Sequence, residues 1–283
     1  MKIYLEITIS ANQDQRDLLI PTMVELGCQG FQETDNSLLC YIDKSRWNDE
    51  KYKLFKEHLG NLSQTISSNA VVTFREFADK DWNEEWEKTI KPIEVGDTLV
   101  IKPSWCEYSG SSKRIIIQID PKMSFGTGYH ETTRLTLRLI EKYITPGCSM
   151  LDVGTGTGIL AIAAIKLGAR SAVGIDNDEW SIDNAQENVH ANRVHDAIRI
   201  SSQNIQALHE SEYDLVTANL TLNTNIEFMR EFKRLLKKDG VLLLSGLLSS
   251  DENIMKLELA KNNFSVLEIV RENEWIAIAA KNT

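Results

Sequence analysis

The sequence predicts an α/β domain built on a mostly parallel sheet, preceded by a smaller α+β domain. Beyond residue 92, strand-like and helix-like segments alternate, which is typical of strands joined by helical crossovers. Before residue 77 the order differs, because two strand-like segments follow each other directly. The length of 283 residues is in keeping with two domains. We therefore expect residues 1–76 and 93–283 to form separate domains, joined by a linker helix over 77–92.

Composition and charge exclude several classes of protein. Hydrophobic residues make up 42% and charged residues 25%, which excludes a wholly disordered or collagen-like chain. The net charge of −10 argues against direct nucleic-acid binding, because such binding needs basic side chains that neutralise phosphates. No apolar run approaches the roughly 20 residues that span a bilayer, and no export signal is recognisable, so we expect a cytoplasmic protein that does not enter a membrane. The four cysteines lack zinc-binding spacing, so we expect free thiols and no metal.

Residues 1–76 contain six expected elements, each recognised by its hydrophobic period. Apolar residues alternate along the first strand and then recur at helical spacing until Gly27 ends the helix. The elements are a strand over 2–9, a helix over 14–26, a hairpin of 29–34 and 38–43, a helix over 49–62 and a strand over 70–77. Strand-helix-strand-strand-helix-strand is the ferredoxin-like order.

Residues 93–283 carry strands and helices at the spacing of βαβ units. The expected strands cover 99–102, 114–119, 149–153, 171–175, 198–200, 213–218, 241–245, 264–270 and 275–280. The expected helices cover 159–166, 179–191, 224–237 and 251–261. Because no helix separates the last two strands, we expect them to form an antiparallel hairpin at the edge of the sheet.

A glycine-rich turn follows the strand over 149–153 and contains Gly154, Gly156 and Gly158. Glycines let the backbone turn tightly and approach a ligand closely, and the following helix adds oriented N–H groups. The spacing is G-x-G-x-G, whereas a dinucleotide-binding turn has G-x-G-x-x-G. Asp152 before the turn would repel a pyrophosphate and tolerate a cationic ligand. A tight turn without any ligand is the alternative.

Two polar residues close other strands of this domain. Asp176 follows the strand over 171–175, where an acid can accept hydrogen bonds from both hydroxyls of a ribose. Asn219 follows the strand over 213–218, and the carboxyl ends of such strands line the ligand crevice. For each residue, the alternative is a cap on the next helix.

A polar loop, FGTGYHETT over residues 125–133, precedes the first strand of the parallel sheet. Its two glycines, four hydroxyl groups and one histidine favour a loop that faces a ligand, so we expect Phe125 and Thr127 to contact it. The alternative is a capped helix entry in which Thr132 or Thr133 bonds the first turn.

These features together resemble the class I S-adenosylmethionine-dependent methyltransferases. The segments DPKMSFGTGYHETT, LDVGTGTGILAIAAIKLGA, VGIDND, TANL and LLSGLL are similar to those of the bacterial PrmA family, which methylates lysine side chains and the N-terminal amine of large-subunit ribosomal protein eleven. The resemblance implies a Rossmann-like methyltransferase domain with S-adenosyl-L-methionine as cofactor, held by Thr133, Gly154, Asp176 and Asn219. It also implies that ribosomal protein, free or on the ribosome, as partner, and residues 1–76 as the domain that recognises it.

The sequence departs from the family in two places. Tyr129-His130-Glu131 stands where many members have Thr-His-Pro, and threonines occupy the turn positions where Cys and Ser are common.

In the expected reaction a substrate amine attacks the sulfonium methyl directly. Asn219 is the candidate that holds the amine, and His130 is a second candidate. The alternatives are a methyltransferase for another protein or a small molecule, a nicotinamide-dependent oxidoreductase, and a non-catalytic binding module.

Overall fold

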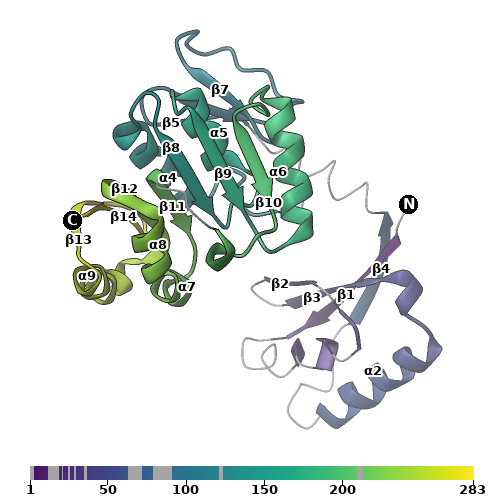
Figure 1. Cartoon of the computed structure of the whole chain (residues 1–283). Coiled ribbons are helices and arrows are strands. Elements are labelled where there is room, and N and C mark those ends of the chain that lie inside the picture. Colours follow the sequence, from purple (N-terminus) through teal and green to yellow (C-terminus); the bar gives the residue numbers. More distant parts are fainter. Residues whose placement is uncertain are drawn as a thin grey trace. The chain divides into compact units, whose positions relative to one another are not determined.

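The computed structural model describes residues 3–11, 19–20, 22–24, 26–28, 30–34, 37–62, 72–78, 91–120, 124–208 and 213–283. The chain divides into two compact units, Met1–Ile90 and Lys91–Thr283 (Figure 1). Of the expected linker helix, residues 79–90 lie outside the described residues, and residues 77 and 78 belong to a strand. The roles of the two units stay predictions.

The first unit contains an antiparallel sheet in the order β2-β3-β1-β4. Its described elements are β1 (Ile3–Ser10), β2 (Gly30–Thr34), β3 (Ser37–Asp43), α2 (Asp49–Leu62) and β4 (Val72–Ala78). Leu5, Ile7 and Ile9 alternate along β1 and are buried, as their period predicts. Gly27 has a φ of +96° at the end of the first helix, of which only residues 19–20 and 22–24 are described. The ferredoxin-like assignment therefore stays a prediction.

The second unit is built on a seven-stranded sheet in the order β10-β9-β8-β11-β12-β14-β13. Its strands are β8 (Ser149–Val153), β9 (Ser171–Ile175), β10 (Ile198–Ser201), β11 (Tyr213–Asn219), β12 (Leu236–Leu248), β13 (Phe264–Glu272) and β14 (Trp275–Asn282). The first five in this order are parallel, and β14 is antiparallel to both of its neighbours. The expected hairpin at the edge of the sheet is present: β13 is the edge strand, and β14 lies between β13 and β12.

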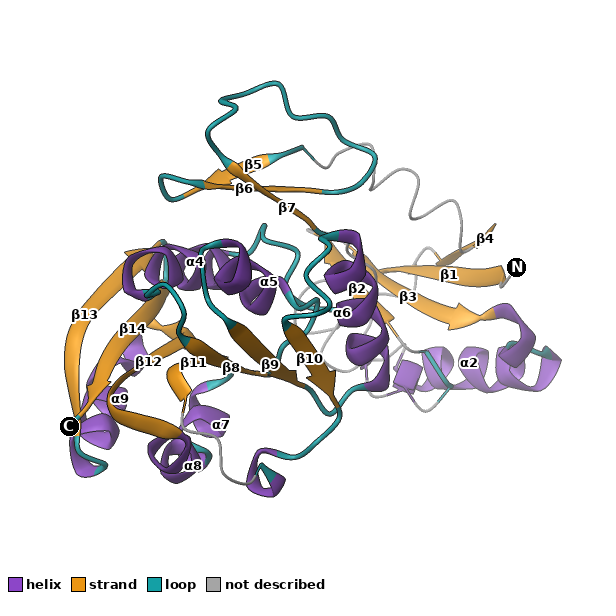
Figure 2. Ribbon diagram, turned by 45° about the horizontal axis from the view of Figure 1, so that its top comes forward, coloured by secondary structure: helices purple, strands orange, loops and turns teal. Residues whose placement is uncertain are grey.

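Helices cover both faces of this sheet. Figure 2 shows α4, α5 and α6 on one face and α7, α8 and α9 on the other. Their bounds are α4 (Glu131–Tyr143), α5 (Ile159–Lys166), α6 (Glu179–Ala191), α7 (Leu222–Glu227), α8 (Met229–Leu235) and α9 (Glu252–Lys261). A small sheet of β5 (Ile93–Val95), β6 (Leu99–Lys102) and β7 (Ile115–Gln118) packs on α4 and α5. The sequence did not indicate β5, a three-residue strand paired with β6.

The single helix expected over 224–237 is wrong. Two short helices, α7 and α8, meet at Phe228, and the chain is extended from Leu236 onward. Leu236 is buried and pairs with Tyr213 of β11, so strand pairing overrides the helical period there. β12 consequently begins earlier than expected.

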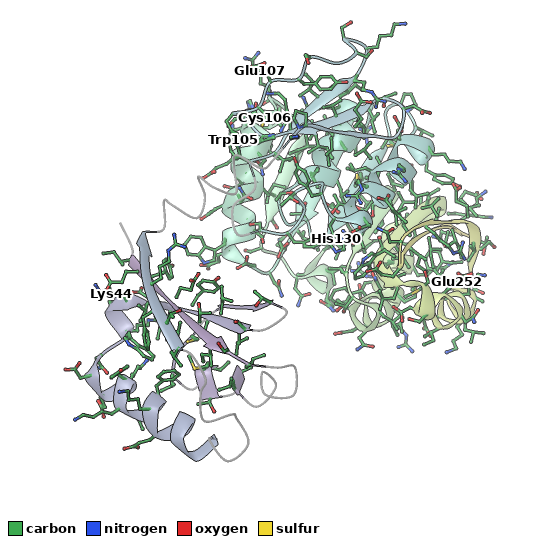
Figure 3. All side chains as sticks on the ribbon, turned by 180° about the vertical axis from the view of Figure 1, so that it is seen from behind. Lys44, Trp105, Cys106, Glu107, His130 and Glu252 are labelled. Atoms are coloured by element: carbon green, nitrogen blue, oxygen red, sulfur yellow. The ribbon has the colours of Figure 1, made fainter. Side chains whose placement is uncertain are left out.

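Ion pairs lie on the surface of both units. In the first unit, Lys44 lies on the surface (Figure 3) and its ammonium is 2.5 Å from the carboxylate of Glu76. In the second, Glu252 at the start of α9 pairs with Lys256 and Arg271. Such exposed pairs contribute little to stability. None of the helices in the described part of the chain is long and apolar enough to cross a bilayer.

Candidate active site

The strand order of the large sheet reverses between β8 and β11, because the chain runs outward from β8 through β9 to β10 and returns beside β8 with β11. Ligands of open α/β sheets bind at the carboxyl ends of the strands on either side of such a point. A cleft of about 460 Å³ lies at this place, lined in part by Gly154, Asp176 and Leu220. The fold therefore brings two of the residues singled out in the sequence to one cleft.

The glycine turn adopts a conformation that only glycine accepts readily. Gly154, Gly156 and Gly158 all have positive φ values, of +71°, +54° and +80°. A Cβ atom on Gly156 would lie 2.3 Å from the carbonyl oxygen of Phe125, which is too close for any side chain. The turn is thus pressed against the loop that precedes α4.

Asp152 does not face the cleft, contrary to the reason for which we singled it out. Its side chain is fully buried and accepts hydrogen bonds from Thr217 (2.6 Å) and Thr155 (2.7 Å). Burial raises the pKa of Asp152 to about 6, although both hydroxyl groups act in the opposite direction. Asp152 therefore fastens the glycine turn to β11, and it gives no information about the charge of a ligand.

Asp176 lies at the edge of the cleft, at the end of β9. One carboxylate oxygen accepts the N–H of Gly156 at 2.9 Å, and the other accepts the N–H of Asp178 at 3.1 Å. The cap of α6 is Asp178, which accepts from Ser181, so the alternative role of Asp176 as a helix cap is wrong. Each oxygen of Asp176 keeps a second lone pair that a ligand hydroxyl could use.

The loop before α4 packs directly on the glycine turn. The N–H of Thr157 donates to the carbonyl of Phe125 at 2.9 Å, and its hydroxyl donates to the carbonyl of Gly126 at 2.6 Å. The Phe125 ring itself is 54% exposed, and its centroid lies 5.3 Å from that of His130. The loop thus offers an exposed aromatic side chain beside the turn.

The two expected threonines differ in their surroundings. Thr127 is half-buried, and its hydroxyl accepts the N–H of Tyr129 at 3.3 Å. Thr133 is buried in the first turn of α4, and its hydroxyl has no hydrogen-bond partner among the described residues. A buried hydroxyl without a partner is uncommon and needs an explanation, such as a ligand or a water.

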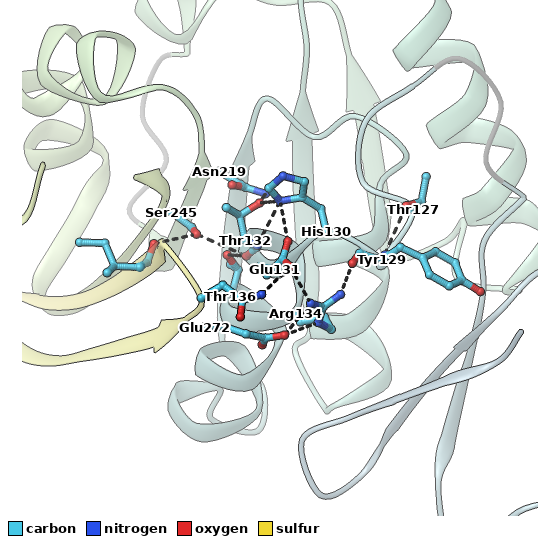
Figure 4. Close-up of polar contacts among 12 residues, drawn as sticks. Thr127, Tyr129, His130, Glu131, Thr132, Arg134, Thr136, Asn219, Ser245 and Glu272 are labelled. Carbon is cyan, nitrogen blue, oxygen red and sulfur yellow. Dashed lines mark hydrogen bonds and ion pairs between the residues drawn. The ribbon is translucent and has the colours of Figure 1, made fainter. Parts of the chain in front are cut away.

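Asn219 and His130 are joined through Thr132 (Figure 4). Asn219 Nδ2 donates to Thr132 Oγ1 at 3.2 Å, and that hydroxyl lies 2.9 Å from His130 Nδ1. His130, rather than Thr132 or Thr133, caps α4, and Thr221 caps α7, so Asn219 is not a helix cap. Asn219 Oδ1 is buried and unpaired within the described part of the chain.

His130 Nδ1 also accepts the N–H of Thr132 at 3.3 Å. This assigns the proton of the neutral ring to Nε2. The ring packs edge-on against Trp275 at the start of β14, with centroids 4.9 Å apart. Its orientation is therefore fixed from two sides.

Three further residues, Ser245, Arg134 and Glu272, hold this site, and their roles could not be inferred from the sequence. The hydroxyl of Ser245 on β12 donates to the carbonyl of Thr132. Arg134 bonds Glu272 of β13 through Nε at 2.8 Å and also the carbonyl of Tyr129. These contacts join residues more than 100 positions apart in two cases, so no local pattern could have revealed them. The serine does lie in LLSGLL, one of the segments singled out above.

Comparison with known proteins places the chain in a family. The profile described as "Ribosomal protein L11 methyltransferase (PrmA)" matches residues 3–283. The ribosomal protein L11 methyltransferase of Caldicellulosiruptor bescii is 33% identical, with 99% of each chain covered. That of Chlorobaculum tepidum is 37% identical over 97% of this chain and 95% of the relative.

A solved structure agrees with these relatives. The crystal structure of ribosomal protein L11 methylase from Lactobacillus delbrueckii subsp. bulgaricus superposes with a TM-score of 0.64 at 31% identity. The match covers 68% of this chain and 98% of that one. The fold is thus that of a class I methyltransferase, which uses S-adenosylmethionine, and the chain belongs to the PrmA family of ribosomal protein L11 methyltransferases.

Proposed function

We propose that this chain transfers methyl groups from S-adenosylmethionine to amines of ribosomal protein L11, namely lysine side chains and the N-terminal amine. The observation that carries the proposal is the match to the family over residues 3–283, together with a cleft at the switch point of the sheet. The proposal includes action in the cytoplasm, on the ribosomal protein either free or within the ribosome, without direct contact to nucleic acid.

Gly154 and Asp176, which line the cleft, and Thr133 and Asn219, which do not, offer groups that fit the methyl donor. Asp176 has acceptor capacity for ribose hydroxyls, and the glycine turn brings backbone close to the cleft. Thr133 Oγ1 and Asn219 Oδ1 are buried polar atoms without a partner among the described residues, and a ligand that reached them would satisfy both. We therefore propose Thr133, Gly154, Gly156, Asp176 and Asn219 as the residues that hold the donor.

Three further residues complete the proposed cofactor site. Phe125 and Thr127 lie on the loop that packs against the glycine turn, and Gly158 is the residue that immediately precedes α5. We expect the exposed ring of Phe125 to cover the donor, while Gly158 allows α5 to start close to it. Because a Cβ on Gly158 would lie 3.3 Å from Ala185, a larger residue would also push α5 away from α6.

In the proposed reaction the bound donor supplies an electrophilic methyl group. The chain's own task is to align an uncharged amine with it. Removing the proton of an ordinary lysine at pH 7 costs about 4.6 kcal/mol, and burial in the site lowers this cost. Asn219 Oδ1 can accept a hydrogen bond from the amine, since Thr132 holds the other end of the amide. His130 can donate from Nε2 but cannot take a proton at Nδ1 without losing the bond from Thr132.

The test is methylation of purified ribosomal protein L11 with labelled S-adenosylmethionine, followed by mass spectrometry of its peptides. We expect label on lysine and N-terminal amines, and much less label with Asp176→Ala when the donor is limiting, because this variant should bind the donor weakly. Comparing the purified ribosomal protein with large subunits that carry it shows whether the free or the assembled protein is methylated. Large subunits that lack this protein are the negative control. The same reaction is also run with a cell lysate in place of the purified protein. Label on other proteins of the lysate, with none on ribosomal protein L11, would contradict the proposal and favour another substrate.

A further inference from the structure

Three asparagines form a row along α6 that the reaction scheme above does not use. Asn184, Asn188 and Asn192 are spaced by four residues and therefore lie on one face of the helix. Their exposed fractions are 2%, 2% and 8%. We call these three residues the asparagine ladder. Asparagine is rarely buried so completely unless its amide is hydrogen-bonded.

The ladder bonds the backbone at the end of β7. Asn192 accepts the N–H of Gln118 at 3.0 Å and donates to the carbonyl of the same residue at 2.6 Å. Asn188 accepts the N–H of Asp120 at 3.0 Å, and Asn184 donates to the carbonyl of Asp120 at 3.2 Å. The side-chain amides thus bond the backbone N–H and C=O groups of Gln118 and Asp120, as the backbone of a neighbouring strand would.

Asn188 differs from Asn192 in its second hydrogen bond. Asn188 Nδ2 donates to the carbonyl of Thr157 at 3.0 Å, inside the glycine turn. Thr157 in turn donates through its N–H to Phe125 and through its hydroxyl to Gly126. One amide therefore bonds the glycine turn, which belongs to the proposed cofactor site, and Asp120 in the segment that follows β7.

The junction leaves little room for movement. A Cβ on Gly126 would lie 2.7 Å from the hydroxyl of Thr157, and one on Gly156 would lie 2.3 Å from the carbonyl of Phe125. The turn also bonds Asp176 through Gly156. A shift of Thr157 would consequently move the loop and the turn together.

We propose that Asn188 is a positioning residue of the methyl-donor site, acting through Thr157. The inference rests on one part of the proposed function, the binding of S-adenosylmethionine. It does not depend on which substrate is methylated. Asn188 holds the glycine turn and the loop in the geometry that the donor requires before it binds, so that binding does not have to order them. Asn192 bonds Gln118 at the end of β7 and the carbonyl of Asn188 within α6, and its hydrogen bonds do not reach the glycine turn or the loop.

The test compares Asn188→Leu with Asn192→Leu in the full chain. Both replacements keep a side chain of similar size and remove an amide that bonds the segment 118–120. Circular dichroism gives the melting temperature, and titration calorimetry gives the Kd for S-adenosylhomocysteine, the demethylated form of the donor. We expect both variants to melt at a lower temperature, and only Asn188→Leu to raise the Kd, by about tenfold.

A Kd of Asn188→Leu within twofold of the wild-type value, or an equal rise in both variants, would overturn the inference. If Asn188→Leu does not fold, Asn188→Asp replaces it and is titrated at about pH 8, because the ionised aspartate still accepts the N–H of Asp120 but cannot donate to Thr157, whereas burial favours its protonated form at lower pH. The same criteria then apply. Absence of binding by the wild-type chain would instead contradict the proposed function, so the two failures are distinguishable.

Discussion

Asp176 and Gly156 are joined by a hydrogen bond of 2.9 Å from the backbone N–H of the glycine to the carboxylate. The bond ties the end of β9 to the turn after the neighbouring strand β8. A carboxylate proposed to hold the ribose of the donor is thus also part of the scaffold. This double role shapes the first prediction, because removing the side chain removes both contributions.

We predict that Asp176→Ala weakens binding of S-adenosylmethionine by about 2–4 kcal/mol, since hydrogen bonds to a charged acceptor are lost. It should also lower the melting temperature slightly, because the N–H of Gly156 loses its partner. Asp176→Asn is the matched control, since its amide oxygen can still accept that N–H. If Asp176 is only structural, Asp176→Asn will bind the donor as the wild type does in a calorimetric titration.

Thr133→Val should weaken binding of the donor without destabilising the chain. The hydroxyl of Thr133 is buried without a partner among the described residues, so a methyl group in its place costs nothing in the free protein. A net loss of about 0.5–1.5 kcal/mol in binding is expected if the hydroxyl bonds the donor. Calorimetry and thermal melting of one variant decide the matter, and an unchanged Kd would remove Thr133 from the proposed site.

The bounds of four parallel strands of the second unit, β8, β9, β10 and β11, could be predicted from the sequence to within one residue. β8 and β9 are short, mainly apolar runs followed by glycine or aspartate. A run of this length and ending is typical of a buried strand and is too short for a helix. The start of β12 at Leu236 could not be predicted in the same way. Its residues have a helical period, and only pairing with β11 makes Leu236 extended.

The candidate site was predictable where one strand end or turn carries the signal, as for Asp176 and the glycine turn. It was not predictable where side chains from distant segments meet. Thr132 bonds Asn219, which is 87 positions away, and Asp152 bonds Thr217, which is 65 positions away. The interpretation of Asp152 was wrong for this reason, since its burial depends on partners that only the fold brings together.

Asp152→Asn should change how stability depends on pH. Burial raises the pKa of Asp152 to about 6 in the folded chain, so the folded state holds this proton more tightly than the unfolded state does. The contribution of Asp152 to stability is therefore fully present below about pH 4 and is lost as the pH rises to about 6, by roughly 3 kcal/mol for a shift of about 2 units. The variant should lack this loss in urea unfolding at several pH values.

Asp214→Asn provides the control of opposite sign. Burial acts to raise the pKa of Asp214, but hydrogen bonds from Lys237 and Ser149 outweigh it and lower the pKa. Its stabilising contribution is therefore present at neutral pH and is lost as the pH falls. If Asp152→Asn keeps the wild-type dependence between pH 4 and 6, the carboxylate does not titrate there.

Residues 91–283 alone should bind the methyl donor as the full chain does but lose most activity on ribosomal protein L11. All the proposed donor-binding residues lie in the second unit, which has its own buried core. The fragment begins at Lys91, because its carbonyl accepts a hydrogen bond from the hydroxyl of Tyr129. The removed unit carries 10 basic and 16 acidic residues, so it has an excess of negative charge. This charge suits a lysine-bearing partner, and its attraction should mainly raise the rate of association.

Two measurements on the fragment separate the roles of the units. We expect the Kd for S-adenosylhomocysteine to stay near that of the full chain, while kcat/KM on ribosomal protein L11 falls at least about tenfold, with most of the effect in KM. The loss should shrink at high salt, where the full chain also loses its electrostatic advantage. Equal kcat/KM for fragment and full chain would mean that residues 1–76 do not recognise the substrate. A fragment that melts normally yet fails to bind the donor would mean that residues before Lys91 belong to the donor site.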